Sequence, residues 1–251
     1  MRAMEIGLIG CGNMAHALAR GWGRPVLCAD PVPGRAGDLA GLVGGTALDS
    51  NAAVAERADV VVLCHKPGQL QSVAAELSGA RAVASILAGV TLAELRGAYP
   101  DRPVYRFMPS LPVEVRRGAV VQAAGEPQAP ELDAAVPALF DELGSLTVLP
   151  ETQIDAAMAL MGCAPAYVAL VAEAQIDAGV RHGLPAEQAA QLVVQTLAGT
   201  AELLRERGND TLRVRREVSS PGGTTARGLA ALERGGVRAA FSDAMDAALE
   251  G

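Results

Sequence analysis

Two glycine-rich turns, one near each end of the chain, have the composition needed to hold an anion against bare backbone amides. The first is Gly10-Cys11-Gly12-Asn13-Met14-Ala15, and the second is Ser220-Pro221-Gly222-Gly223-Thr224-Thr225. Glycine lets a ligand approach the main chain, and a helix that starts at such a turn directs free amides and its positive dipole end at the anion. We interpret the first turn as a dinucleotide site and the second as a carboxylate site. The chain is therefore expected to bring a nicotinamide to a small acid.

The first turn lies where a dinucleotide-binding fold requires it. An apolar run, Glu5 to Ile9, predicts a buried strand, and the helical pattern His16 to Trp22 follows the turn. In the pattern Gly-x-Gly-x-x-Ala, the first glycine permits the tight turn and the second admits the pyrophosphate, while Ala15 keeps helix and strand close. Strand, turn and helix in this order predict dinucleotide binding.

Asp30 follows the second predicted strand, about 20 residues after the turn, where an acidic side chain accepts hydrogen bonds from the adenosine ribose. This favours NAD(H). Arg35 is one short loop away and is able to reach a ribose phosphate, so NADP(H) stays open. A plain turn at 30–34 is the alternative to any cofactor role.

Lys66 is the one lysine among 21 basic residues. It follows the predicted strand 59–64 in Cys64-His65-Lys66-Pro67, at the carboxyl edge of the sheet, where ligands of such folds bind. An ammonium group there is suited to cofactor oxygen atoms. A solvated side chain without a ligand is the alternative.

The second turn precedes a helical pattern over 226–234. Its glycines supply freely oriented amides, its threonines supply hydroxyls, and the helix start supplies positive potential. These features suit a carboxylate, although an ordinary helix cap has the same composition.

The arrangement of apolar segments predicts two domains. Short runs at 5–10, 25–29, 59–64, 82–86 and 118–122 alternate with helical patterns, which indicates a parallel sheet covered on both faces. From about Glu151 onward only long helical patterns occur, including 164–180 and 185–204. We therefore predict an α/β Rossmann-type parallel sheet domain over 1–150, followed by an all-α dimerisation and substrate domain over 151–251.

The helices of the second half are apolar around much of their circumference. They need a partner, because on their own they would leave a large hydrophobic surface in water. We predict a homodimer through these helices, with a higher oligomer left open.

The net charge of −7 disfavours nucleic acid and anionic membranes as partners. No secretory leader pattern precedes the first strand, so a cytoplasmic location is expected. The four scattered cysteines predict reduced, mostly buried thiols and no metal site.

The motifs together resemble the pyrroline-5-carboxylate reductase family, over nearly the whole chain. The shared segments are the turn at Gly10, Lys66-Pro67, Ser85 to Val90, Arg106-Phe107-Met108-Pro109, Pro165-Ala166-Tyr167, Asp177 to Val180, and Ser220 to Thr225 followed by Leu232-Glu233. The Ser-Pro-Gly-Gly-Thr-Thr motif is the most specific of them.

The resemblance implies a function and a set of site residues. It implies reduction of the cyclic imino acid L-1-pyrroline-5-carboxylate to L-proline with NADPH or NADH, at a site completed across the dimer. Thr225 is implied as the catalytic residue, orienting the ring nitrogen. The substrate carboxylate is assigned to Ser220, Gly222, Gly223, Thr224 and Thr225. The cofactor is assigned to Ile9, Gly10, Cys11, Gly12, Asn13, Met14, Asp30, Asn51, Cys64, His65, Lys66, Pro67, Ile86, Leu87 and Ala88.

One four-residue segment and three single residues depart from the family pattern and leave alternatives open. Met161-Gly162-Cys163-Ala164 stands where Ser-Gly-Ser-Gly is usual, and Ser110 stands where asparagine is usual. Glu217 would repel a substrate carboxylate unless it is paired, for instance with an arginine among 213–216. Asp30 occupies a slot that is small and polar in NADPH-preferring relatives. The alternatives are a reductase of a different cyclic imine and a nucleotide-binding dimer without turnover. Alcohol oxidation is disfavoured, because the second half has no lysine and its one histidine, His182, is at a predicted helix end.

Overall fold

The structure is a computed structural model that describes residues 4–250. It divides into two compact units, the first ending at Cys163 and the second beginning at Ala164. Residues 1–3 and 251, at the outer ends of the two predicted domains, lie outside the described residues. The boundary near Pro150 stays a prediction. Residues 151–163 belong to the first unit, where Ile154 is buried in the sheet core.

The first unit is built on an eight-stranded sheet in the order β3-β2-β1-β4-β5-β6-β7-β8. Strands β1 to β6 are all parallel, as the alternating pattern predicted. The strands are β1 (Ile6–Ile9), β2 (Leu27–Ala29), β3 (Thr46–Ala47), β4 (Val60–Leu63), β5 (Val83–Ser85), β6 (Val104–Pro109), β7 (Gly118–Ala123) and β8 (Gly144–Leu149).

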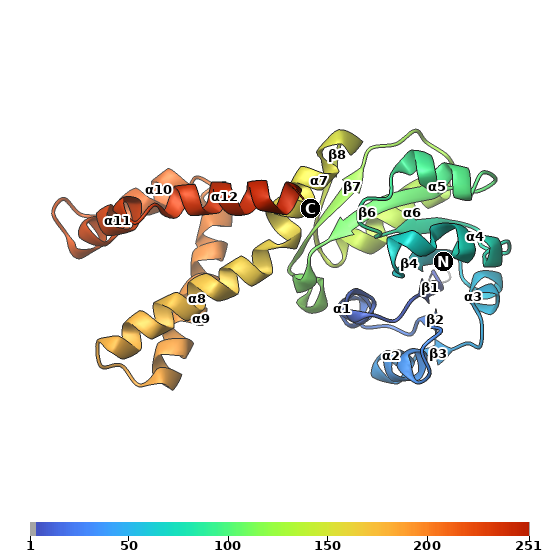
Figure 1. Ribbon diagram of the computed structural model, residues 1–251, viewed down its shortest axis with the longest axis horizontal. Helices are drawn as coiled ribbons and strands as arrows, with labels where there is room; N and C mark the ends of the chain where they lie inside the picture. The colour runs from blue at the N-terminus through green and yellow to red at the C-terminus, as the bar shows by residue number, and fades with distance from the viewer. Residues whose placement is uncertain (1–3, 251) are drawn as a thin grey trace. The chain divides into compact units, whose positions relative to one another are not determined.

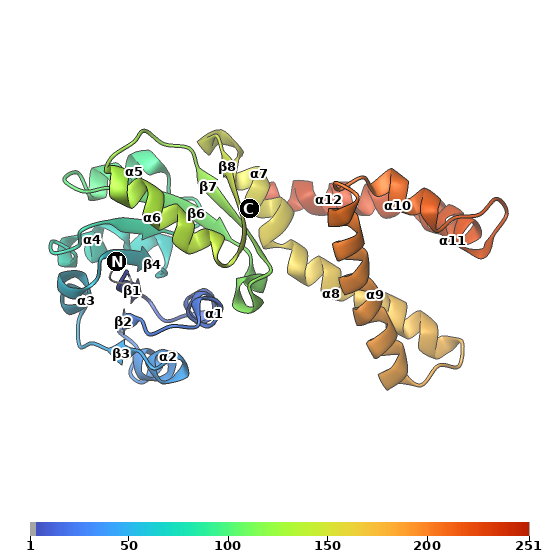
Figure 2. The ribbon, with the colours of Figure 1, turned by 180° about the vertical axis from the view of Figure 1, so that it is seen from behind.

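Helices cover both faces of the sheet (Figures 1 and 2). Each face has its own apolar core. On one face lie α1 (Asn13–Trp22), α2 (Arg35–Val43) and α6 (Pro130–Asp141), with Trp22 edge-on to Phe140, which stacks on Phe107. On the other lie α3 (Asn51–Arg57), α4 (Leu70–Glu76), α5 (Leu92–Ala98) and α7 (Ile154–Ala157). Burial on both faces explains why β1, β4 and β5 are almost wholly apolar.

The last two strands, β7 and β8, run opposite to the other six and so depart from the predicted all-parallel sheet. β6 and β7 pair antiparallel, because the segment between them is a short 3₁₀ turn, Leu111–Val115, instead of a crossover helix. β7 and β8 are joined through α6 and are parallel to each other. β3, β6 and β8 were not predicted as strands. Arg106 interrupts the apolar run in β6, β3 has two residues, and β8 is a largely exposed edge strand.

A hydrogen-bonded carboxylate holds the start of α6. Asp133 accepts from the Tyr105 hydroxyl at 2.7 Å and from the amides of Gln128 and Ala129 at 2.9 Å. The Tyr105 hydroxyl, followed by the two amides, lowers the pKa of Asp133. The interaction therefore requires the ionised carboxyl.

We expect Asp133→Ala to lower the free energy of unfolding by about 1 kcal/mol at pH 7, as loss of a helix cap does. Since the folded pKa of Asp133 lies below its unfolded value of about 4, the deficit should be present at neutral pH and vanish as the pH falls through the folded pKa. Urea titrations at pH 7 and at steps down to pH 3 measure it. The control is Glu131→Ala, which removes a first-turn carboxylate that makes no hydrogen bond or ion pair with any of residues 4–250. An equal deficit at pH 3 and pH 7 would contradict the assignment.

The second unit is wholly helical over its described residues, as predicted. It contains α8 (Ala164–Arg181), α9 (Ala186–Glu206), α10 (Thr211–Glu217), α11 (Thr224–Arg234) and α12 (Val237–Leu249), and α8 packs on α9. The breaks between helices contain Gly183, Gly208-Asn209, Gly222 and Gly236, all with positive φ. Glycine, and less often asparagine, adopts this left-handed conformation where helices end.

The second unit buries few of its own apolar side chains. Among residues 164–250, Ala189 and Val214 are the buried ones. Large exposed apolar side chains include Val168, Leu170, Leu192, Val194, Leu232 and Phe241. The helical run Glu151–Arg181 is also long and apolar enough, by length and composition, to cross a membrane. It exceeds the predicted 164–180 helix because it continues back through α7 and a π turn at Met158–Gly162.

Candidate dinucleotide cleft and carboxylate loop

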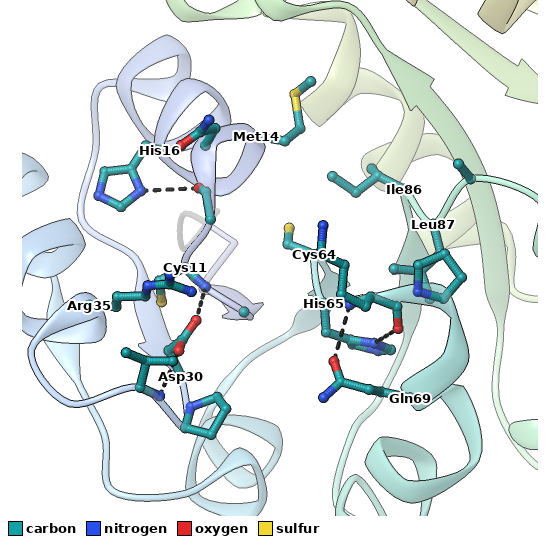
Figure 3. A pocket seen from close by; sticks show the side chains of 18 of the residues that line it. Cys11, Met14, His16, Asp30, Arg35, Cys64, His65, Gln69, Ile86 and Leu87 are labelled. Carbon is teal, nitrogen blue, oxygen red and sulfur yellow. Dashed lines mark hydrogen bonds between the residues drawn. The ribbon is translucent and has the colours of Figure 1, made fainter. Parts of the chain in front are cut away.

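A cleft of about 830 Å³ lies at the carboxyl ends of β1, β2, β4 and β5 (Figure 3). It gathers all of the predicted cofactor residues except Ile9, which is within β1, and Asn51, which begins α3 and donates to Glu76. Those predicted residues are Gly10 to Met14, Asp30, Cys64 to Pro67 and Ile86 to Ala88. Sequence reasoning did not assign the further lining residues His16, Pro31, Val32, Gln69, Met108 and Pro109. The sequence signal for Met108 and Pro109 was the segment Arg106-Phe107-Met108-Pro109, which is shared with the family.

The two glycines of the first turn have different constraints. Gly10 has a φ of 91°, and a Cβ there would meet the Cys64 carbonyl carbon and the His65 nitrogen at 2.9 Å. Gly12 has an ordinary φ of −80°, and a Cβ there would meet no atom of residues 4–250 within 4 Å. Gly10 is therefore required by the fold, whereas Gly12 leaves open space at the start of α1. Because Gly12 caps α1 without a side-chain bond, the first amides of α1 are free for phosphate oxygens. The residues present fit a bound dinucleotide.

Asp30 links the end of β2 to the glycine turn. Its carboxylate accepts from the Cys11 amide at 2.7 Å and from the Val32 amide at 2.8 Å. Arg35 lines the same wall, and its side chain makes no hydrogen bond or ion pair with any of residues 4–250 (Figure 3). A fixed carboxylate and an unengaged guanidinium thus share the side of the cleft where the adenosine ribose is expected.

The opposite wall is formed by the turn after β4. The Lys66 amide donates to the Gln69 side chain at 3.2 Å, and His65 Nδ1 lies 2.9 Å from the Lys66 carbonyl oxygen. Nδ1 must carry the proton to donate to a carbonyl, which leaves Nε2 unprotonated and enclosed. Burial lowers the pKa of His65, in agreement with a neutral ring. His65 therefore shapes this turn, and the exposed Lys66 side chain supplies its charge.

The three cysteines near the cleft, Cys11, Cys28 and Cys64, are free thiols, as is Cys163. Cys11 and Cys28 are buried, and the Cys11 thiol donates to the Ala29 carbonyl at 3.6 Å. The Cys28 thiol next to it, together with burial, raises the pKa of Cys11, and burial raises the pKa of Cys64. Raised pKa values make the Cys11 and Cys64 thiols poor nucleophiles. Within residues 4–250, no group of three or more His, Cys, Asp or Glu is arranged to hold a metal ion.

The second glycine-rich turn lies in the second unit and begins α11. Gly222 has a φ of 67°, and Gly223 is the N-cap with no side-chain bond. Thr224 and Thr225 are the first residues of the helix, so their amides lack intrahelical acceptors. Arg227 donates to the Gly222 carbonyl at 2.7 Å and fixes the turn. The local geometry leaves two amides and a hydroxyl available to a carboxylate.

The departures from the family pattern have local explanations. Glu217 is paired, accepting from Arg213 at 3.0 Å and from Arg207 at 3.1 Å, and the arginines lower its pKa. Ser110 is buried, and its hydroxyl accepts from the Ala119 amide at 2.9 Å, so it joins β6 to β7. Met161 packs against the sheet core from within the π turn.

Comparison with known proteins gives matches over the whole chain. The sequence model for pyrroline-5-carboxylate reductase dimerisation matches residues 151–251, and that for NADP oxidoreductase, coenzyme F420-dependent, matches residues 5–89. The pyrroline-5-carboxylate reductase of Synechocystis is 36% identical, over 98% of this chain and 96% of its own. That of Mycobacterium tuberculosis is 37% identical, over 97% and 94%.

Solved structures agree with these matches. The 1-pyrroline-5-carboxylate reductase of Streptococcus pyogenes has a TM-score of 0.88 at 30% identity, covering 98% of this chain and 97% of its own. The Plasmodium falciparum pyrroline carboxylate reductase with NADP bound has a TM-score of 0.87 at 27% identity, covering 100% and 97%.

The sheet order, the glycine turn and the cleft define a Rossmann-type oxidoreductase that uses a nicotinamide dinucleotide. Within that class, the relatives from Synechocystis, Mycobacterium tuberculosis and Streptococcus pyogenes are all named as pyrroline-5-carboxylate reductases. The chain belongs to the pyrroline-5-carboxylate reductase family.

Proposed function

We infer that this protein reduces L-1-pyrroline-5-carboxylate to L-proline with NADPH or NADH. The observation that carries the inference is the match, over 97–98% of the chain, to relatives named for this reaction. The cleft supports it, because its glycine turn and free helix amides suit a dinucleotide.

The reaction makes modest demands on the protein. A protonated cyclic imine is already an electrophile, so the chain must position it, exclude water and hold its carboxylate. The dinucleotide, when bound, supplies the hydride for carbon 5 of the ring. We assign the carboxylate to the Ser220–Thr225 loop, whose free amides at Thr224 and Thr225 support this role. The Thr225 hydroxyl orients the ring nitrogen, and water supplies the proton.

The functional unit we propose is a cytoplasmic homodimer formed through the C-terminal helices. The dimerisation match and the exposed apolar side chains of 164–250 support the dimer. Sedimentation equilibrium should give twice the chain mass, or a multiple of it for a higher oligomer, at micromolar concentration. A stable monomer that still turns over would overturn this proposal.

The activity is tested by following NADH and NADPH oxidation with pyrroline-5-carboxylate and with a six-membered cyclic imino acid. The expected result is turnover of the five-membered imine with at least one cofactor. Preference for the six-membered ring would favour the second candidate, a reductase of a different cyclic imine, which the Met161 to Ala164 departure supports. Cofactor binding without turnover of either imine would favour a nucleotide-binding dimer.

Cofactor preference is expected to depend on Asp30. A carboxylate held at this wall by two amides accepts from a ribose hydroxyl and repels a ribose phosphate, so we propose that NADH is preferred. Asp30→Ser should shift the ratio of kcat/KM for NADH over that for NADPH toward NADPH by at least about tenfold. The ratio is the useful measurement, because damage to the glycine turn affects both cofactors alike.

Arg35→Gln is the matched variant for this wall. It should weaken NADPH more than NADH, because the guanidinium is free to pair with the extra phosphate. An unchanged ratio in Asp30→Ser would remove Asp30 from cofactor selection.

A further inference from the structure

Arg106 is a buried cation that does not line the cleft. It is the third residue of β6, its side chain is 3% exposed, and Ser85 of β5 is its neighbour in register. Its Nη1 lies 2.9 Å from Glu151 Oε1, and its Nη2 lies 3.4 Å from Asp155 Oδ1. Its Nε has no hydrogen-bond partner in the part of the chain that the structure describes. A buried ion pair is weak grounds for stability, because desolvation offsets the attraction. The contacts of its partner Glu151 therefore matter more for its role than the strength of the ion pair.

Glu151 connects Arg106 to the cleft wall. The same oxygen that meets Arg106, Oε1, accepts from the Leu92 amide at 2.6 Å. Leu92 is the first residue of α5 and directly follows 86–91, which includes the lining residues Ile86 to Ala88. At the other end of this segment the Ser85 hydroxyl accepts from the Leu87 amide at 3.2 Å. The segment is thus held at both ends by groups outside the cleft.

Glu151 also begins the helical run that continues in sequence into α8. Residues 151–251 are the part of the chain that matches the dimerisation family. Glu151 is the first residue of that region, and its Oε1 binds Leu92, which directly follows a wall segment of the dinucleotide cleft. Both partners lie in the first compact unit.

We propose that Arg106 is a positioning residue that, through Glu151, sets the 86–91 segment for the dinucleotide. The guanidinium neutralises Glu151 and fixes its rotamer, so that Oε1 stays on the Leu92 amide. Arg106 acts without touching the cofactor. This inference rests on the proposed use of a nicotinamide dinucleotide, and not on the identity of the imine.

Loss of the connection should weaken cofactor binding selectively. We expect Arg106→Met and Glu151→Ala to raise the dissociation constant of the preferred cofactor by about tenfold, because a lining segment is displaced. The KM for the imine should change much less. Arg106→Lys and Glu151→Gln should give smaller increases, because each keeps one of the bonds. Asp155→Asn is the control and should stay within about twofold, since Asp155 is largely exposed and makes only the longer contact.

The experiment combines calorimetric titration of NADH and NADPH, without imine, with hydrogen exchange of the full-length dimer. The variants are first shown by circular dichroism and sedimentation to be folded and to have the wild-type mass. In Glu151→Ala, peptides covering 86–92 should exchange faster and those of α1 should not. If Arg106→Met or Glu151→Ala does not fold, Arg106→Lys and Glu151→Gln decide the question.

The proposal is overturned if folded variants bind cofactor within about twofold of wild type, or bind weakly with unchanged exchange at 86–92. A lower melting temperature with normal cofactor affinity would mean a structural role alone. Because binding is measured without imine, an absence of imine turnover leaves the result interpretable.

Discussion

Gly12→Ala is expected to abolish most cofactor affinity and leave the fold intact. The new Cβ meets no protein atom within 4 Å and the backbone φ is ordinary, so the thermal midpoint should stay within about 3 °C. The methyl group projects into the space at the start of α1 where the pyrophosphate must approach the main chain. A steric cost of about 2 kcal/mol corresponds to roughly a thirtyfold rise in the dissociation constant of NADH or NADPH.

Gly10→Ala is the matched comparison, two residues away in the same turn. It forces alanine into a φ of 91° and brings Cβ within 2.9 Å of backbone atoms of Cys64 and His65. Strain and overlap together should lower the thermal midpoint by at least about 5 °C as well as weaken binding. Thermal unfolding and calorimetric titration of both variants measure the difference. Normal cofactor affinity in a folded Gly12→Ala would place the dinucleotide elsewhere.

Thr225→Ala should lower kcat with the imine by about a hundredfold, as removal of a positioned hydrogen bond to the reacting group does. Cofactor affinity should be unchanged, because we assign the Thr225 hydroxyl to the ring nitrogen of the imine and not to the dinucleotide. Steady-state kinetics with saturating cofactor, together with cofactor titration, separate the two effects.

Two variants control this prediction. Thr224→Ala keeps the amide that we assign to the carboxylate, so its kcat should fall by no more than about threefold. Thr225→Ser restores the hydroxyl and should recover most of the rate. Unchanged kinetics in Thr225→Ala would remove Thr225 from the mechanism.

Local patterns were sufficient to predict the parts of the fold on which the cleft depends. β1, β4 and β5 are short apolar runs because both faces of the sheet are covered, and the glycine turn follows β1 as expected. The antiparallel β6–β7 pair escaped prediction, because it depends on the short connection at Leu111–Val115. β8 escaped because an exposed edge strand carries no continuous apolar run.

The site was predictable where a motif marked it and less so where long-range contacts define it. The glycine turn, Asp30 and the Cys64 to Pro67 turn come together at strand ends, as the topology requires. No sequence pattern relates Glu151 to Leu92 or Arg106, because these contacts join residues 59 and 45 positions apart. The role of the 220–225 loop stays a prediction that the variants above test.

Isotope transfer is the most direct test of the proposed reaction. The protein is incubated with pyrroline-5-carboxylate and with NADH or NADPH deuterated at carbon 4 of the nicotinamide, and the product is examined by mass spectrometry and proton NMR. We expect L-proline that carries one deuterium at carbon 5. The deuterium should come from one of the two faces of the nicotinamide ring and not from the other. Oxidation of the cofactor without deuterated proline, or no transfer with either cofactor and either face, would contradict the assignment.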